Sequence, residues 1–285
     1  MIDPSELVKT CISSKVVELS DGIRAKLSPA QLEIIDRRTR DLEFLAFRYS
    51  VSSGAISAGF AIASKSSDQD KLPVIIYLRG GTRDFGVINA GTMYLQLAVL
   101  AELGYIVIGT QYTGNSLGSG TDTWGGEDLD AVMYLHEIIA QLDRVNNDDV
   151  TMIGGSRGAA MMYMALKKGF QAKRAISLAG VSDLSSWIEA REDMRDVFSE
   201  MFGDDMTHEL NARSAVRWVN ELPKQIKYTL IHGSNDLTVP LIQSEKLAEL
   251  MDREGLNYDL HVLADYDHHI TVSTPAVLDI LKQEL

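Results

Sequence analysis

The residues with the clearest chemical potential are Gly154, Ser156 and Gly158, which form a Gly-x-Ser-x-Gly motif after an apolar run at 150–153. In this pattern a sharp turn between a strand and a helix exposes the serine hydroxyl. The two glycines allow the turn and let the helix pack close to the strand. Residues 159–166 are good helix formers, so strand, turn and helix follow in the required order. We therefore predict that Ser156 is a nucleophile.

A serine hydroxyl needs a general base, and the base needs a carboxylate that orients it. Where the nucleophile sits on such a turn, the order along the chain is serine, acid, histidine. Asp236 follows the apolar run 228–231, and His268 and His269 follow the run 260–263. Both loops begin where a predicted strand ends, which is where the active sites of open α/β sheets lie. We predict Asp236 as the acid and one of the two histidines as the base.

His268 and His269 compete for the role of base. We favour His268, because Asp267 and His268 end the turn and Ile270 then anchors the loop on the core side. The sequence alone leaves the choice open. His232 closes a strand, and we expect it to brace the acid loop rather than to carry a proton.

A third component, an oxyanion hole, is predicted where Arg79, Gly80 and Gly81 follow the apolar run 74–78. Paired glycines let the chain expose backbone N–H groups toward a carbonyl oxygen. We predict Gly81 as one donor, with Gly80 making room, and the N–H of Arg157 as the second. For the Arg79 side chain we consider binding of a substrate carboxylate and pairing with an acid, and we favour the pairing.

The elements that must position these residues form an α/β pattern. From residue 72 onward short apolar strands alternate with amphipathic helices, which is typical of a parallel sheet with crossover connections. Two antiparallel strands precede them at 42–48 and 56–62, and we expect 64–71 to be a hairpin connection. The sequence thus predicts a mostly parallel sheet of eight strands with helices on both faces. The expected parallel strands are 74–78, 105–109, 150–154, 174–178, 227–232 and 258–263, and the expected helices lie near 90–103, 126–143, 157–169, 241–254 and 274–284.

We predict one domain over residues 1–285, because the length suits one large α/β domain and no linker or repeat divides it. Residues 1–40 are expected to be a polar, helical N-terminal extension. Residues 182–220 are charged, aromatic and helical, and we expect them to form an insertion, or cap, over the carboxyl edge of the sheet.

Four segments in this order resemble the catalytic domain of prolyl oligopeptidase-like serine peptidases, within the α/β-hydrolase superfamily. They are Arg79–Gly81, Trp124–Asp130, Gly154–Gly158 and His232–Pro240. The resemblance runs from about residue 70 to the C-terminus, and it implies an α/β-hydrolase fold with Ser156 as nucleophile, Asp236 as acid and His268 as base. In one departure, the oxyanion loop reads Arg79-Gly80-Gly81, whereas family members have His-Gly-Gly or a tyrosine motif there. In the other, the forty leading residues are too few for the propeller that gates peptide access in large members.

The predicted function is hydrolysis of an ester or a peptide-like amide bond through an acyl-enzyme on Ser156. One alternative is a serine peptidase for short peptides rather than a carboxylesterase. The other is a non-catalytic binding protein with the same fold. The expected partner is a small-molecule ester or short-peptide substrate. The oligomeric state stays open between a monomer and a homo-oligomer.

Charge, cysteine content and the N-terminal sequence argue against several other classes of protein. With 27 basic and 40 acidic residues the net charge is −13, which argues against nucleic-acid binding and adhesion to anionic membranes. Cys11 is the single cysteine, so an internal disulfide or a cysteine-based metal cluster is excluded. We find no cofactor motif and expect no cofactor. The N-terminus lacks the basic and long apolar regions of a signal peptide, and we expect a cytoplasmic protein without a membrane span.

Overall fold

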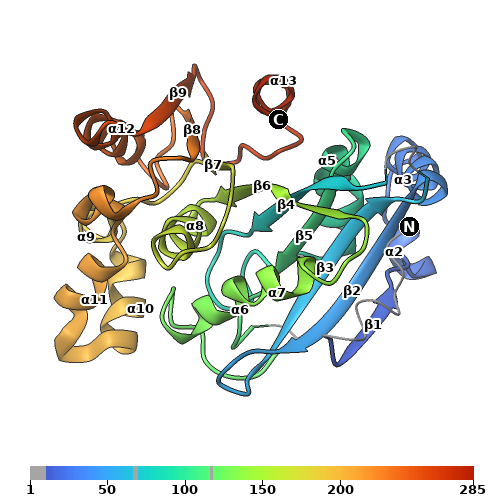
Figure 1. Ribbon diagram of the computed structural model, residues 1–285, viewed down its shortest axis with the longest axis horizontal. Coiled ribbons are helices and arrows are strands. Elements are labelled where there is room, and N and C mark those ends of the chain that lie inside the picture. Colours follow the sequence, from blue (N-terminus) through green and yellow to red (C-terminus); the bar gives the residue numbers. More distant parts are fainter. Residues whose placement is uncertain (1–10, 67–69, 116–117) are drawn as a thin grey trace.

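A single nine-stranded sheet organises the molecule (Figure 1). The computed structural model describes residues 11–66, 70–115 and 118–285. The strand order is β1-β2-β3-β5-β4-β6-β7-β8-β9; β1, β2, β3 and β5 pair antiparallel, and the neighbours from β5 to β9 pair parallel. The strands are β1 (Ser13–Val16), β2 (Leu42–Ser50), β3 (Ile56–Ser64), β4 (Leu72–Leu78), β5 (Ile106–Thr110), β6 (Val145–Gly155), β7 (Arg174–Leu178), β8 (Lys227–Gly233) and β9 (Asn257–Leu263). The α/β-hydrolase fold and its mostly parallel sheet are thereby confirmed.

Helices cover both faces of the sheet because its central strands are apolar on both sides. In β4, Val74 and Ile76 belong to one core, whereas Ile75 and Tyr77 belong to the core on the opposite face. The first face is covered by α6 (Asp130–Met133), α7 (Leu135–Ile139), α8 (Arg157–Lys167) and α12 (Ile242–Glu254). The second face is covered by α3 (Pro29–Asp41), α4 (Ala90–Thr92), the π-helical turn η1 (Met93–Leu97), α5 (Ala98–Glu102) and α13 (Pro275–Glu284).

The sheet has one strand more than the eight expected, and the extra strand lies in the segment predicted to be helical. Ile12 N–H donates to the Arg48 carbonyl and Val17 N–H to the Phe44 carbonyl, so the chain adds β1 to the edge of β2. The pairing partner lies some thirty residues further on and is invisible to a local pattern. Helices do form at α2 (Asp21–Arg24) and at α3, whose N-cap Ser28 makes a capping box. Residues 1–10 of the expected extension lie outside the described residues.

The expected hairpin connection at 64–71 is wrong. β3 pairs with β5, and β4 lies on the far side of β5. β3 and β4 are therefore not neighbours, and their connection is not a hairpin. Residues 67–69 of it lie outside the described residues. β4 thus lies in the middle of the sheet, next to β6. The chain continues from β4 to its neighbour on one side, β5, and from β6 to its neighbour on the other side, β7. Ligand sites in such sheets usually lie at the point where the strand order changes direction in this way.

Residues 182–220, which we call the insertion, are largely helical. They contain α9 (Leu184–Trp187), α10 (Glu192–Phe202) and α11 (Met206–Ala212), with short 3₁₀ turns η3 (Gly203–Asp205), η4 (Ala215–Arg217) and η5 (Val219–Glu221). Another 3₁₀ turn, η2 (Glu127–Leu129), precedes α6. No helix in the part of the chain that the structure describes is long and apolar enough to cross a membrane.

Candidate active site

Ser156 occupies a sharp turn between β6 and α8. Its backbone angles, φ 53° and ψ −119°, are ones that non-glycine residues rarely adopt. The glycines on either side are required by space: a Cβ on Gly154 would lie 2.4 Å from the carbonyl oxygen of Gly158, and a Cβ on Gly158 would lie 2.0 Å from that of Leu78. This close packing presents Ser156 at the carboxyl edge of the sheet.

The structure brings Ser156 together with His268 and Asp236. His268 Nε2 lies 3.1 Å from Ser156 Oγ, and His268 Nδ1 lies 2.7 Å from Asp236 Oδ2. The three residues come from loops that follow β6, β9 and β8. The Asp236 side chain is fully buried, whereas that of His268 is partly exposed. A continuous hydrogen-bond path therefore runs from a shielded carboxylate to a hydroxyl at the surface of the site.

Asp236 is held by backbone and side-chain donors. Its Oδ1 accepts hydrogen bonds from the N–H groups of Thr238, at 2.9 Å, and Val239, at 2.8 Å. Burial acts to raise the pKa of this carboxyl, but contacts with His232, His268 and the Val239 N–H outweigh burial and hold the pKa well below its usual range. Asp236 is thus ionised at neutral pH, and its charge favours the His268 tautomer that carries the proton on Nδ1.

The other histidines of this region lie away from the serine hydroxyl. The His269 side chain is 86% exposed, and its Nδ1 lies 3.3 Å from Asp267. His232 is buried, with Nδ1 2.7 Å from Ser244 Oγ and Nε2 2.8 Å from the Val239 carbonyl oxygen. His232 therefore ties the acid loop to α12. Of the two candidates for the base, the structure brings His268 to the serine.

Of the predicted oxyanion donors, Gly81 lies in the loop after β4, and Arg157 follows Ser156 directly as the first residue of α8. Gly80 packs directly on the serine, since a Cβ there would lie 3.1 Å from Ser156 Cβ. Gly81 has a φ of 79°, and a Cβ on it would lie 2.0 Å from the Phe85 carbonyl oxygen, so the turn requires glycine. Outside the helices and strands of the described residues, no backbone carbonyl accepts a hydrogen bond from the N–H of Gly81 or Arg157.

The Arg157 side chain lies beneath the site in an ion-pair network that no sequence pattern marks. Its guanidinium contacts Asp122 through both Nη atoms, at 2.7 and 2.6 Å, and Asp128 at 2.7 Å. It also lies over the rings of Tyr112 and Trp124, 4.8 and 4.9 Å from their centroids. Burial raises the pKa of Asp128, whereas at Asp122 the bonds from Arg157 outweigh burial and lower the pKa. One guanidinium thus pairs with two buried carboxyls whose pKa values shift in opposite directions.

Arg79 takes neither of the two roles considered for it. The side chain is 1% exposed, and its Nη atoms donate to four backbone carbonyls rather than pointing at substrate space. The favoured pairing with an acid is therefore replaced by contacts with the backbone of its own loop and of residue Gln111.

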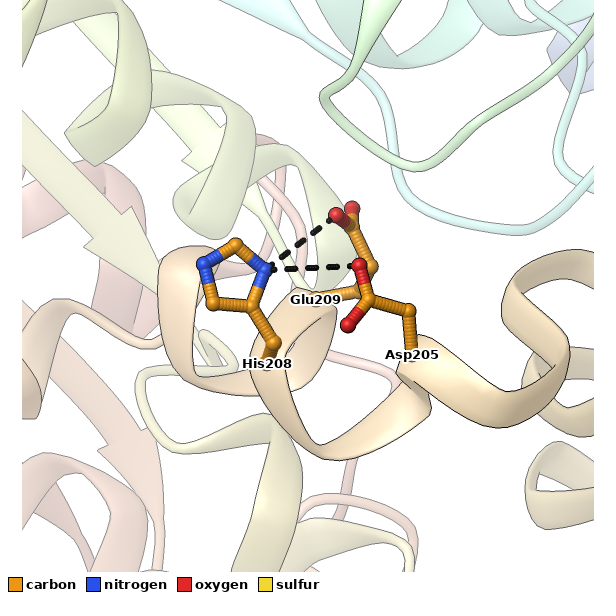
Figure 2. A group of neighbouring side chains, drawn as sticks. All are labelled: Asp205, His208 and Glu209. Carbon is orange, nitrogen blue, oxygen red and sulfur yellow. Dashed lines mark ion pairs between the residues drawn. The ribbon is translucent and has the colours of Figure 1, made fainter.

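Within the residues that the structure describes, two groups of histidine and carboxylate side chains could hold a metal ion. One consists of Asp205, which ends η3, and His208 and Glu209, in the first turn of α11 (Figure 2). His208 Nδ1 lies 3.7 Å from Asp205 Oδ2 and 3.5 Å from Glu209 Oε1. Asp205 and His208 are exposed, and Glu209 also pairs with Arg213. The second group is Asp259, His261 and Glu284. Neither group includes a residue that contacts Ser156.

The insertion contacts the loops on both sides of Ser156. Trp187 Nε1 donates to the carbonyl oxygen of Thr238, in the acid loop, at 2.8 Å. On the other side, Glu200 pairs at 3.1 Å with Arg83, which belongs to the loop after β4. The insertion therefore borders the site from the oxyanion loop to the acid loop.

Comparison with known proteins relates the chain to a family of peptidases. The model described as the prolyl oligopeptidase family matches residues 92–285. The uncharacterized peptidase YtmA of Bacillus subtilis (strain 168) is 31% identical over 178 residues, covering 61% of this chain and 67% of that protein. Dipeptidyl aminopeptidase B of Saccharomyces cerevisiae is 26% identical over 212 residues, covering 70% of this chain and 25% of that protein. The chain thus spans only about a quarter of the yeast relative.

Two solved structures share the fold at low sequence identity. The puromycin-hydrolyzing peptidase of Mycobacterium tuberculosis superimposes with a TM-score of 0.71 at 21% identity, over 84% of this chain and 38% of that one. Esterase B of Lactobacillus rhamnosis superimposes with a TM-score of 0.68 at 17% identity, over 93% of both chains. Since the family model covers most of the chain, from residue 92 to its end, the chain belongs to the prolyl oligopeptidase family and is a serine hydrolase.

Proposed function

We propose that the chain cleaves ester or peptide-like amide bonds through an acyl-enzyme on Ser156, with a Ser-Asp-His catalytic triad. The observation that carries the proposal is the unbroken hydrogen-bond path from Asp236 through His268 to Ser156. The strained backbone at Ser156 supports it, since strain of this kind is kept where function requires it. A non-catalytic binding protein would need neither feature.

The geometry supports the following sequence of steps. His268 Nε2 takes the Ser156 hydroxyl proton while Oγ attacks the carbonyl carbon, and the ionised Asp236 stabilises the imidazolium that forms. The N–H groups of Gly81 and Arg157 stabilise the negative charge on the carbonyl oxygen. His268 then gives its proton to the leaving alcohol or amine, and the C–O or C–N bond breaks. A water molecule, deprotonated by His268, attacks the acyl carbon. His268 returns that proton to Ser156 Oγ as the bond between Oγ and the acyl carbon breaks, and the acid is released.

The substrate proposed is a small-molecule ester or a short peptide. A relative at 31% identity carries the name of a peptidase, which favours short peptides as the second, narrower candidate. The esterase of similar length shares the fold alone, at 17% identity. We propose that the insertion forms a wall of the substrate pocket, since it borders both loops beside Ser156. A cytoplasmic location, and the absence of nucleic-acid and membrane partners, remain predictions from composition.

The test is labelling with a fluorophosphonate probe, followed by assay of p-nitrophenyl esters and aminoacyl anilides. Wild type is expected to be labelled, and Ser156→Ala to lose both labelling and turnover. Ser53→Ala, at an exposed serine in the β2–β3 turn, is the matched control and should keep both. The better-cleaved set separates an esterase from a peptidase. A folded wild type that is neither labelled nor active would reject the proposal and favour a binding protein.

A further inference from the structure

The side chain of Arg79 lies inside the loop that follows β4 and holds it together. One Nη atom donates to the carbonyl oxygens of Gly80, at 2.9 Å, and Phe85, at 3.0 Å. The other donates to those of Arg83, at 2.8 Å, and Gln111, at 3.0 Å. The planar guanidinium with its fixed fork of donors suits such a set of carbonyls, and a lysine ammonium does not.

Packing alone does not explain an arginine at this position. Burial lowers the pKa of Arg79, which means that the charged form is held there against a desolvation cost. A methionine or leucine would fill similar space without that cost. The contribution specific to arginine is therefore its hydrogen bonds to the loop backbone.

One of these bonds controls the group predicted to stabilise the oxyanion. The carbonyl of Gly80 and the N–H of Gly81 belong to the same peptide plane, and in a trans peptide they point in opposite directions. Because Arg79 Nη1 holds the Gly80 oxygen, the direction of the Gly81 N–H is fixed too: it points away from Arg79 Nη1 within that plane. Gly80 itself packs on Ser156, with a Cβ-to-Cβ separation of only 3.1 Å if it carried a side chain. The Gly80–Gly81 peptide therefore begins at a residue that packs against the nucleophile.

The next peptide of the loop is tied in a similar way. Arg157 Nη1 lies 3.2 Å from the carbonyl oxygen of Gly81. Both guanidinium groups lie over the Tyr112 ring, that of Arg79 at 5.1 Å and that of Arg157 at 4.8 Å from its centroid. The Tyr112 hydroxyl donates to the Arg79 carbonyl oxygen at 2.8 Å. The peptides on both sides of Gly81 are therefore fixed by buried arginines.

We propose that Arg79 is a positioning residue of the oxyanion hole, which sets the orientation of the Gly80–Gly81 peptide so that the Gly81 N–H faces the carbonyl oxygen of the substrate. The inference rests on the proposed function, since it assigns a task within that same site. Arg79 acts through Gly81 and does not itself contact the substrate.

The experiment compares Arg79→Met and Arg79→Lys with wild type, using the best substrate of the panel. Removal of one oxyanion donor typically lowers kcat by about 10²–10³-fold, and we expect Arg79→Met to lose about 100-fold with substrate affinity changed by less than about twofold. A boronic acid inhibitor, which forms a tetrahedral adduct with the serine, should weaken in parallel. Arg79→Lys keeps the charge but not the fork, and should still lose at least about tenfold.

Arg38→Met is the matched control. Arg38 is also a buried arginine that donates to backbone carbonyls, those of Tyr94 and Leu95, but it lies on α3, away from the site. We expect this variant to lose stability as Arg79→Met does while keeping kcat.

Three results would overturn the inference. They are an unchanged kcat in folded Arg79→Met, full activity in Arg79→Lys, and a loss of kcat in Arg38→Met equal to that in Arg79→Met. Failure of the proposed function looks different, because wild type itself would then be inactive and unlabelled. Arg79→Lys retains three donors and the charge and is the variant that keeps the test open if Arg79→Met does not fold.

Discussion

At the scale of single residues, the Asp236 carboxylate divides its two oxygens between two tasks. Oδ1 accepts two backbone N–H groups, whereas Oδ2 faces imidazole nitrogens, His268 Nδ1 at 2.7 Å and His232 Nε2 at 3.3 Å. The backbone bonds prevent the carboxylate from rotating, so Oδ2 remains aimed at the imidazole. As a result His268 keeps a proton on Nδ1 and presents the Nε2 lone pair to Ser156.

Asp236→Asn should therefore abolish most of the activity without unfolding the protein. An amide cannot stabilise the imidazolium, and it favours the tautomer in which Nε2 carries the proton. Replacing the triad aspartate by asparagine typically lowers kcat by about 10⁴-fold. Steady-state kinetics at neutral pH, with circular dichroism to show that the variant is folded, provides the measurement. A kcat within tenfold of wild type would remove Asp236 from the mechanism.

The same substitution predicts a specific pH dependence of stability. The folded-state pKa of Asp236 is depressed, so its ionisation stabilises the fold above the unfolded pKa of about 3.9, and this contribution is lost as pH falls toward the folded pKa. The unfolding free energy of wild type minus that of Asp236→Asn should thus be positive and constant at neutral pH and shrink below about pH 4. Asp265→Asn, at an exposed acid in the neighbouring loop, should show no such change. A difference that grows on acidification would contradict the assignment.

At the scale of elements, the approach of α8 to β4 depends on Gly158. A Cβ on this residue would lie 2.0 Å from the Leu78 carbonyl oxygen and 2.9 Å from that of Arg79, and backbone atoms cannot give way as a side chain does. Gly158→Ala is expected to push the helix off the sheet and to cost at least about 3 kcal/mol, with loss of activity. Gly22→Ala is the control, because a Cβ there meets open space. Urea unfolding of both variants checks the prediction, and a Gly158→Ala variant as stable as wild type would refute it.

The elements and the Ser156 turn could be predicted because they rest on local patterns. The Gly-x-Ser-x-Gly motif fixes its own turn, and the order of Ser156, Asp236 and His268 follows from the loops at the carboxyl ends of three strands. What the sequence left open was the choice between His268 and His269. Only the packed loop decides which imidazole points inward and which remains in solvent.

Features that depend on partners far along the chain were not predictable. β1 exists because of its pairing with β2, although its own polar sequence suggested a helix. Asp122 and Asp128 bind Arg157 from positions that lie 35 and 29 residues away. The carbonyls that hold Arg79 carry no side-chain signature at all, since any residue type can supply a carbonyl oxygen. The sequence therefore suggested an acidic partner for Arg79, whereas its partners are backbone carbonyls.

At the scale of the whole molecule, the net charge of −13 should act on the choice of substrate. The excess acid extends to the site, because Asp265 and Asp267 both precede His268 in the same loop. A negative potential concentrates cationic molecules and repels anionic ones, and salt screens it. The protein should thus prefer cationic over anionic substrates of the same acyl group.

We expect kcat/KM for a cationic ester to exceed that for an anionic ester by about tenfold at an ionic strength of about 0.01 M, where the Debye length is about 30 Å. This ratio should fall several-fold at about 0.15 M, where that length is about 8 Å. A neutral isostere serves as control and should respond little to salt. Long-range attraction predicts that the two charged esters converge as salt rises. A preference that persists unchanged would instead mean that a direct contact in the pocket selects the charge. Asp265 and Asp267, in the His268 loop, would then be the residues to replace.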